Sequence, residues 1–137
     1  MAKLTEIAPE LYAAVQVDRA AIAAIAASGA KTLINNRPDG EEADQPLAAD
    51  IEAAAEAAGI SYRHVPILRG IGPADVEAMQ DALRGAQGGQ ALAFCRSGNR
   101  SALTWALAMR AEGLAREEIE QRVTDAGFNV APIAHLL

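Results

Sequence analysis

The sequence has 137 residues, 51% of them hydrophobic, and a formal net charge of -6 at pH 7. This length predicts one compact domain over residues 1–137, burying roughly two-thirds of the surface that an unfolded chain exposes. No apolar run reaches the ~18–20 residues of a membrane span, and the first residues lack the pattern of a secretory signal. The acidic balance argues against nucleic acid and anionic membranes as partners. We therefore expect a cytoplasmic protein.

The first half of the sequence predicts two helices and up to three strands. Short apolar runs around Pro9 predict one or two edge strands within residues 4–17. Asp18 can cap a helix that runs to about Ser28, and Gly29 follows as its stop. The next predicted elements are a buried strand at 31–35, a turn at 35–40 and a helix at 47–58.

The second half continues the alternation of strands and helices. The predicted elements are a strand at 62–67, a flexible connection at 68–72, a helix from Pro73 to about Leu83, a break at 87–90, an apolar strand at 91–94, and helices at 99–111, 116–124 and 131–136. This order predicts an α/β fold with a mainly parallel central sheet of four to five strands flanked by helices. In such sheets the ligand site lies beyond the carboxyl ends of the strands.

Cys95 is the only cysteine, so no disulfide can hold the fold. It ends the apolar strand at 91–94 and precedes a short glycine-containing loop and a helix. A helix N-terminus and a nearby guanidinium favour a thiolate, and loop amides that point inward can bind an anion. A cysteine that only packs in the core does not need such neighbours. We therefore predict Cys95 as the nucleophile and Arg100 as the catalytic residue that binds two oxygens of a tetrahedral anion.

Further residues at this edge of the sheet are predicted to bind the substrate. They come from the loop and helix that follow Cys95 and from the ends of two other strands. They are Arg96, Ser97, Gly98, Asn99, Ser101, Arg69 and Arg37. Ser101 can hydrogen-bond the cysteine sulfur or cap the helix. No metal or other cofactor is predicted, because one cysteine and two distant histidines have no recognisable ligand spacing.

Three blocks of the sequence carry a family resemblance: Cys-x-x-Gly-x-Arg-Ser at 95–101, the block at 34–41 and the block at 62–67. Together they resemble the phosphatase-like domain that occurs alone or fused to beta-lactamase-like persulfide dioxygenases, over about residues 4–110. The resemblance implies a single catalytic domain with the fold of the dual-specificity protein phosphatases, and a persulfide dioxygenase as a partner. Members of the family have been described both as phosphatases and as sulfurtransferases.

Two features of the sequence favour sulfur transfer over phosphate hydrolysis. Protein tyrosine phosphatases carry His-Cys-x5-Arg, whereas here Phe94 replaces the histidine and four residues separate Cys95 from Arg100, as in rhodaneses. Phosphatases of this fold have an acidic aspartate after the strand at 62–67, but here no carboxylate follows until Asp75, and Arg69 can hold an anionic donor. We therefore expect a sulfurtransferase that moves sulfur from thiosulfate or a persulfide to a thiol or cyanide through a Cys95 persulfide.

Two alternatives to sulfur transfer stay open. The first is a cysteine phosphatase-type hydrolase of phosphotyrosine-like or small aryl phosphates, with its general acid drawn from Asp39, Glu41 or Asp75. The second is an anion-binding or redox-sensing module in which Cys95 is oxidised reversibly without turnover. Rates with thiosulfate and with an aryl phosphate separate these possibilities.

Overall fold

The computed structural model describes residues 4–86 and 89–137. Its five strands form one sheet in the order β1-β2-β5-β3-β4. The strands are β1 (Leu4–Ala8), β2 (Leu11–Ala14), β3 (Ala30–Asn35), β4 (Ser61–His64) and β5 (Gln90–Phe94). β1 runs antiparallel to β2, and the other three neighbouring pairs are parallel. The predicted α/β fold with a mainly parallel sheet is confirmed.

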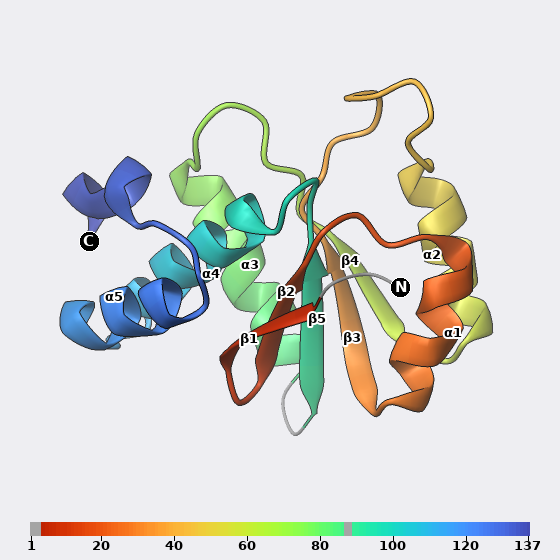
Figure 1. Cartoon of the computed structure of the whole chain (residues 1–137), viewed down its shortest axis with the longest axis horizontal. Helices are drawn as coiled ribbons and strands as arrows, with labels where there is room; N and C mark the ends of the chain where they lie inside the picture. The colour runs from red at the N-terminus through yellow and green to blue at the C-terminus, as the bar shows by residue number, and fades with distance from the viewer. Residues whose placement is uncertain (1–3, 87–88) are drawn as a thin grey trace.

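Helices cover both faces of the sheet (Figure 1). They are α1 (Arg19–Ala27), α2 (Ala48–Ala57), α3 (Pro73–Gly85), α4 (Asn99–Ala111), α5 (Arg116–Asp125) and the 3-10 helix η1 (Ala131–Leu136). α1 and α2 pack on one face, and α3, α4 and α5 lie on the other, so the buried apolar residues form two clusters. Within residues 4–86 and 89–137, no helix is both long enough and apolar enough to cross a membrane.

Local signals explain where the elements begin and end. The Asp18 carboxylate accepts a hydrogen bond from the backbone N–H of Ala21 at 2.7 Å, which caps α1 as predicted. Ile22 and Ile25 on one face of α1 are buried against the sheet. β5 lies in the middle of the sheet and has helices on both faces, which explains why every residue after its first, Gln90, is apolar and buried.

The strand predicted at 62–67 is shorter in the structure, because β4 ends at His64. Pro66 has no backbone N–H for the ladder. Val65 and Ile67 on either side of it still donate to the carbonyl oxygens of Asn35 and Asn36, at 2.8 and 3.0 Å. This irregular segment therefore follows the edge of β3 before the chain turns away.

Three further predictions concern the edge strands, the last helix and the break at 87–90. Of the two strands predicted as edge strands, only β1 lies at the edge, because β2 is paired with β1 and with β5. The last predicted helix is a 3-10 helix. The break predicted at 87–90 includes residues 87–88, which lie outside the described residues.

The carboxyl ends of β2, β3, β4 and β5 point to the same edge of the sheet, at the top of Figure 1, where the loops that follow them converge. The backbone N–H of Cys95 donates to the carbonyl of Ala14 at the end of β2, at 3.2 Å. On the other side, the N–H of Asn36 donates to the carbonyl of Phe94 at 2.8 Å. Cys95 is therefore fixed at the centre of this edge.

Candidate active site

The loop from Cys95 to Gly98 wraps around the cysteine sulfur. The backbone N–H of Gly98 donates to Cys95 Sγ at 3.1 Å. α4 begins at the next residue, Asn99, so the sulfur lies at the N-terminal end of a 13-residue helix. The partial positive charge of that end and the Gly98 N–H both stabilise a negative charge on the sulfur. The predicted arrangement of strand, loop, sulfur and helix is present.

Gly98 has two reasons to be glycine. Its φ angle is +89°, in the left-handed region that side chains disfavour. A Cβ atom there would also lie 3.2 Å from Cζ of Phe128, which lies in the segment between α5 and η1. Phe128 therefore closes the outer side of the loop, and the C-terminal segment helps to hold the N–H group that reaches the sulfur.

The thiol is shielded in this structure. Cys95 is 0% exposed, whereas Arg96 and Ser97 in the same loop are exposed and Arg100 is partly buried. A substrate atom that bonds to the sulfur must touch it. A reactant can therefore bond to Sγ only after a local movement that exposes the sulfur.

Arg100 lies in the first turn of α4, and its guanidinium is held by two groups from other loops. Nη1 donates to Glu41 Oε2 at 2.7 Å and to the carbonyl of Ile67 at 2.9 Å, and Nη2 donates to Glu41 Oε1 at 2.8 Å. These bonds leave the Nε–H and one Nη2 N–H without an oxygen partner among the described residues, and, after the bonds to Glu41, an interaction with the Cys95 sulfur contributes to the raised pKa of Arg100. Two adjacent donors of this kind match two oxygens of a tetrahedral anion.

The charges of Glu41, Arg100 and Cys95 are coupled. The hydrogen bonds from Arg100 are the main cause that lowers the pKa of Glu41 to about 2, with Arg37 adding to the shift and burial opposing it. The hydrogen bonds to Glu41 also raise the pKa of Arg100; burial opposes this rise, and the charge of an ionised Cys95 adds to it. Glu41 is therefore a carboxylate that holds an arginine, not a proton donor at neutral pH.

This shift predicts how stability depends on pH. Since the pKa of Glu41 falls from 4.5 to about 2 on folding, its ionised form contributes stability above pH 4.5 that is lost as the pH falls to about 2. We expect the difference in the free energy of unfolding between wild type and Glu41→Gln to shrink over that interval in urea titrations. A difference that stays constant with pH would contradict the shift.

Arg37 has a different place from the one predicted. It was expected to bind substrate, but it is 2% exposed, and its guanidinium nitrogens donate to Gln16, Glu41 and Glu42 at 3.0, 2.9 and 2.6 Å. Because this guanidinium is buried and each of its three nitrogens already donates to a side-chain oxygen, Arg37 does not present an accessible edge to an anion. The physical reason is the pair of glutamates that follows the turn at 38–40 and folds back over Arg37.

The other predicted binding residues lie around the loop. Arg96 is 68% exposed in its side chain and has Nε 3.5 Å from Glu42 Oε1. Ser97 is exposed, and its hydroxyl accepts the N–H of Asn99 at 3.3 Å. Ser101 is buried, but its hydroxyl has no hydrogen-bond partner among the described residues, so neither role expected for it is seen. Arg69 is exposed in the connection between β4 and α3.

The predicted candidates for a general acid all have structural partners. Asp39 Oδ1 accepts the N–H of Ala48 at 2.7 Å, at the start of α2. Asp75 Oδ2 accepts the N–H of Gly72 at 2.9 Å, which caps α3. Glu41 is the ionised partner of Arg100. Within the described part of the chain, none of these three carboxylates is free of a backbone or arginine partner.

Sequence reasoning missed three participants in the site. Glu41 was considered only as an acid, yet it is the partner of Arg100 from 59 positions away. Gln16 and Phe128 were not singled out at all. The block at 34–41 was a usable signal for Glu41, because it carries one of the three stretches of the family resemblance. Neither Gln16 nor Phe128 has a local sequence signal.

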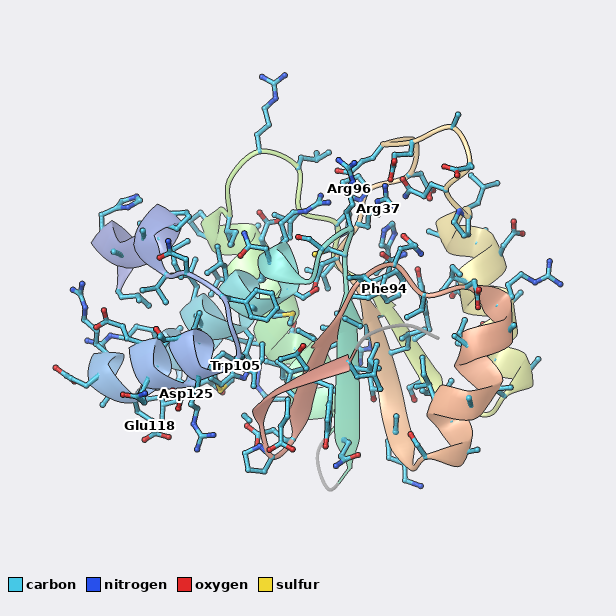
Figure 2. The ribbon with its side chains drawn as sticks, viewed as in Figure 1. Arg37, Phe94, Arg96, Trp105, Glu118 and Asp125 are labelled. Carbon is cyan, nitrogen blue, oxygen red and sulfur yellow. The ribbon has the colours of Figure 1, made fainter. Side chains whose placement is uncertain are left out.

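Figure 2 shows Arg37 and Arg96 at the same end of the sheet, above Phe94 in β5. Glu118 and Asp125 lie on α5, away from this end. Glu118 pairs with Arg122 on the same helix at 3.1 Å and takes no part in the site. The charged residues of α5 therefore belong to a solvated face, separate from the charges around Cys95.

Comparisons with known proteins show which proteins this chain is similar to. Residues 3–112 match the family described as beta-lactamase hydrolase-like protein, phosphatase-like domain. A beta-lactamase hydrolase-like protein of Xylella fastidiosa is 38% identical over 104 residues, which are 74% of this chain and 24% of that protein. The chain thus spans about a quarter of the length of the curated relatives that it matches.

Solved structures give the same result. A candidate phosphatase from Neisseria meningitidis is 38% identical, with a TM-score of 0.77 and coverage of 93% of this chain and 91% of that one. Human DUSP28 is 22% identical with a TM-score of 0.63, covering 90% of this chain and 80% of that one, and shows the fold alone. The comparisons support a phosphatase-like enzyme domain, and they give no support to the expected sulfur transfer.

Proposed function

Since the chain belongs to the family of phosphatase-like domains of beta-lactamase hydrolase-like proteins, we propose that it is a cysteine phosphatase-type hydrolase of aryl phosphate monoesters. The observation that carries the proposal is the guanidinium of Arg100, which Glu41 and the Ile67 carbonyl hold beside Cys95 with its Nε–H and one Nη2 N–H unpaired to any oxygen of the described residues. A fixed pair of donors beside a cysteine at a helix N-terminus suits an anion that the sulfur attacks.

The reaction has two steps. The Cys95 thiolate attacks phosphorus, an S–P bond forms, and the P–O bond to the aryl group breaks with its electron pair on the phenolate. Water then attacks the phosphocysteine, the S–P bond breaks, and inorganic phosphate and the thiolate are released. The N–H groups of the loop and the free edge of Arg100 hold the phosphoryl oxygens through both steps.

Because Asp39, Glu41 and Asp75 have other partners, we expect the rate to depend strongly on how easily the leaving group departs without a proton. General acid catalysis contributes about 10²–10⁴ in rate when a leaving group needs a proton. We expect no such contribution here, so kcat/KM for 4-nitrophenyl phosphate should exceed that for phenyl phosphate by roughly 10²-fold or more. Initial rates with both esters measure this ratio.

Asp75→Asn is the control for this ratio, because it leaves a residue of the same shape at the cap of α3. We expect the ratio to be the same in wild type and in the variant. Nearly equal rates with the two esters in wild type, together with a steeper dependence in Asp75→Asn, would identify Asp75 as an acid. That result would overturn the present assignment of its role.

A second function, sulfur transfer, is favoured by the four-residue spacing between Cys95 and Arg100, which gives a tighter ring of amides than the five-residue phosphatase loop. The thiolate would attack the outer sulfur of thiosulfate, forming an S–S bond as sulfite leaves with the electron pair. A thiol or cyanide would then take the outer sulfur and regenerate the thiolate. The donor, the acceptor and a persulfide dioxygenase would be its partners. Steady turnover of thiosulfate with cyanide, at rates above those with any aryl phosphate, would favour this function.

A further inference from the structure

A buried arginine lies next to the site without reaching the cysteine. Arg37 is 2% exposed, yet each of its guanidinium nitrogens has an oxygen partner. Nε donates to Glu41, Nη1 to Gln16 and Nη2 to Glu42, at 2.9, 3.0 and 2.6 Å. Burial of a charge costs free energy unless the charge is paired and hydrogen-bonded. The Arg37 guanidinium is thus a buried charge whose burial costs free energy, and the partners that offset this cost come from two separate segments.

The main chain of Arg37 is fixed as well. Its N–H donates to Asn35 Oδ1 at 2.9 Å, and Nε2 of His64, the last residue of β4, lies 3.0 Å from its carbonyl oxygen. The side-chain amide of Gln16, in the segment between β2 and α1, fixes the far end of the guanidinium. Arg37 is therefore anchored from the segments on both sides of β3, and its Nε–H points in one defined direction.

That direction is toward the carboxylate that holds Arg100. Glu41 Oε1 accepts from Arg37 Nε at 2.9 Å and from Arg100 Nη2 at 2.8 Å, while Oε2 accepts from Arg100 Nη1 at 2.7 Å. Among the described residues, no hydrogen bond joins Arg37 to Arg100 or to Cys95 directly. The hydrogen-bonded path from Arg37 to Arg100 therefore runs through the orientation of this one carboxylate. Glu42, by contrast, connects Arg37 only to the exposed Arg96.

We propose that Arg37 is a positioning residue for the proposed reaction: it fixes the plane of the Glu41 carboxylate, so that both oxygens meet Arg100 and its free edge faces the anion. Without Arg37, the Glu41 side chain, which is 30% exposed, can rotate toward water. Arg100 would then keep its charge, but its guanidinium would no longer be held in one orientation. The inference rests on the proposed role of Arg100 in holding the anion.

A double-mutant cycle tests this role. We expect Arg37→Met to lower kcat/KM for 4-nitrophenyl phosphate about 10-fold in the wild-type background, and less than about twofold when Glu41 is already Gln. A purely structural role would give the same loss in both backgrounds, and equal losses would overturn the proposal. Arg37→Lys keeps the charge without the Nε–H, so it should not restore the rate.

A binding measurement covers the case in which a variant is too slow to assay. In the Cys95→Ser background, the same cycle is run on the Kd for inorganic phosphate, followed by the NMR signal of the Arg100 Nε–H. The expected result is again a loss that depends on Glu41, with all variants compared below their unfolding temperatures. If wild type neither turns over the ester nor binds phosphate, the proposed function fails and the inference with it. If it does both and the cycle shows no coupling, only the role of Arg37 fails.

Discussion

Replacing Cys95 by serine is expected to lower kcat/KM for 4-nitrophenyl phosphate by at least about 10³-fold, because an alkoxide is far less available than a thiolate at neutral pH. Serine is close in size to cysteine, and its oxygen can still accept the Gly98 N–H that reaches the sulfur at 3.1 Å. The loop should therefore keep its shape. Initial rates at saturating and at low ester concentration measure the loss in kcat and in kcat/KM.

The control for this loss is the affinity of the variant for inorganic phosphate, which binds to the site without reacting. Since the donors to the anion are the loop amides and Arg100, Cys95→Ser should bind inorganic phosphate with a Kd close to that of wild type. Retained binding with lost turnover places the loss in the chemical step. A variant that turns the ester over at more than a tenth of the wild-type rate would show that another group is the nucleophile.

Arg100→Lys is expected to have the second largest effect, a loss of roughly 10²–10³-fold in kcat/KM. Lysine keeps the positive charge but cannot donate at once to both Glu41 oxygens, the Ile67 carbonyl and two oxygens of the anion. Both kcat and the affinity for phosphate should fall, because the guanidinium edge contacts the anion throughout the reaction.

Arg116→Lys is the matched control for Arg100→Lys. Arg116 lies on α5 and pairs with Glu120 at 3.1 Å on an exposed face. The same exchange there should change kcat/KM by less than about twofold. An Arg100→Lys variant with nearly wild-type rates would remove the observation on which the proposed function rests.

Features encoded by neighbouring residues could be predicted from the sequence. α4 begins and ends at the predicted residues, Asn99 and Ala111, because a glycine precedes it and another follows two positions after its end. The position of Cys95 between an apolar strand and a helix also followed from the local sequence. The edge of the sheet at which it lies followed from the general rule for parallel sheets.

Features that depend on pairing between distant loops could not be predicted. Nothing in the residues near Glu41 indicates that Arg100 will be its partner, and the charge pattern alone made Arg37 look like a second anion-binding arginine. Which arginines can bind an anion depends on how deeply each one is buried and on which edge of its guanidinium the acidic neighbours leave accessible. Those neighbours become visible only when the loops after β3 and β5 are placed together.

The mass of the group that Cys95 carries during turnover distinguishes phosphate transfer from sulfur transfer. Wild type is mixed with 4-nitrophenyl phosphate or with thiosulfate and quenched within one turnover, and its mass is measured by intact-protein mass spectrometry. We predict an addition of about 80 Da with the ester on wild type and none on Cys95→Ser, since the intermediate is a phosphocysteine. An addition of about 32 Da with thiosulfate, and none with the ester, would contradict the phosphatase assignment and identify Cys95 as a sulfur carrier.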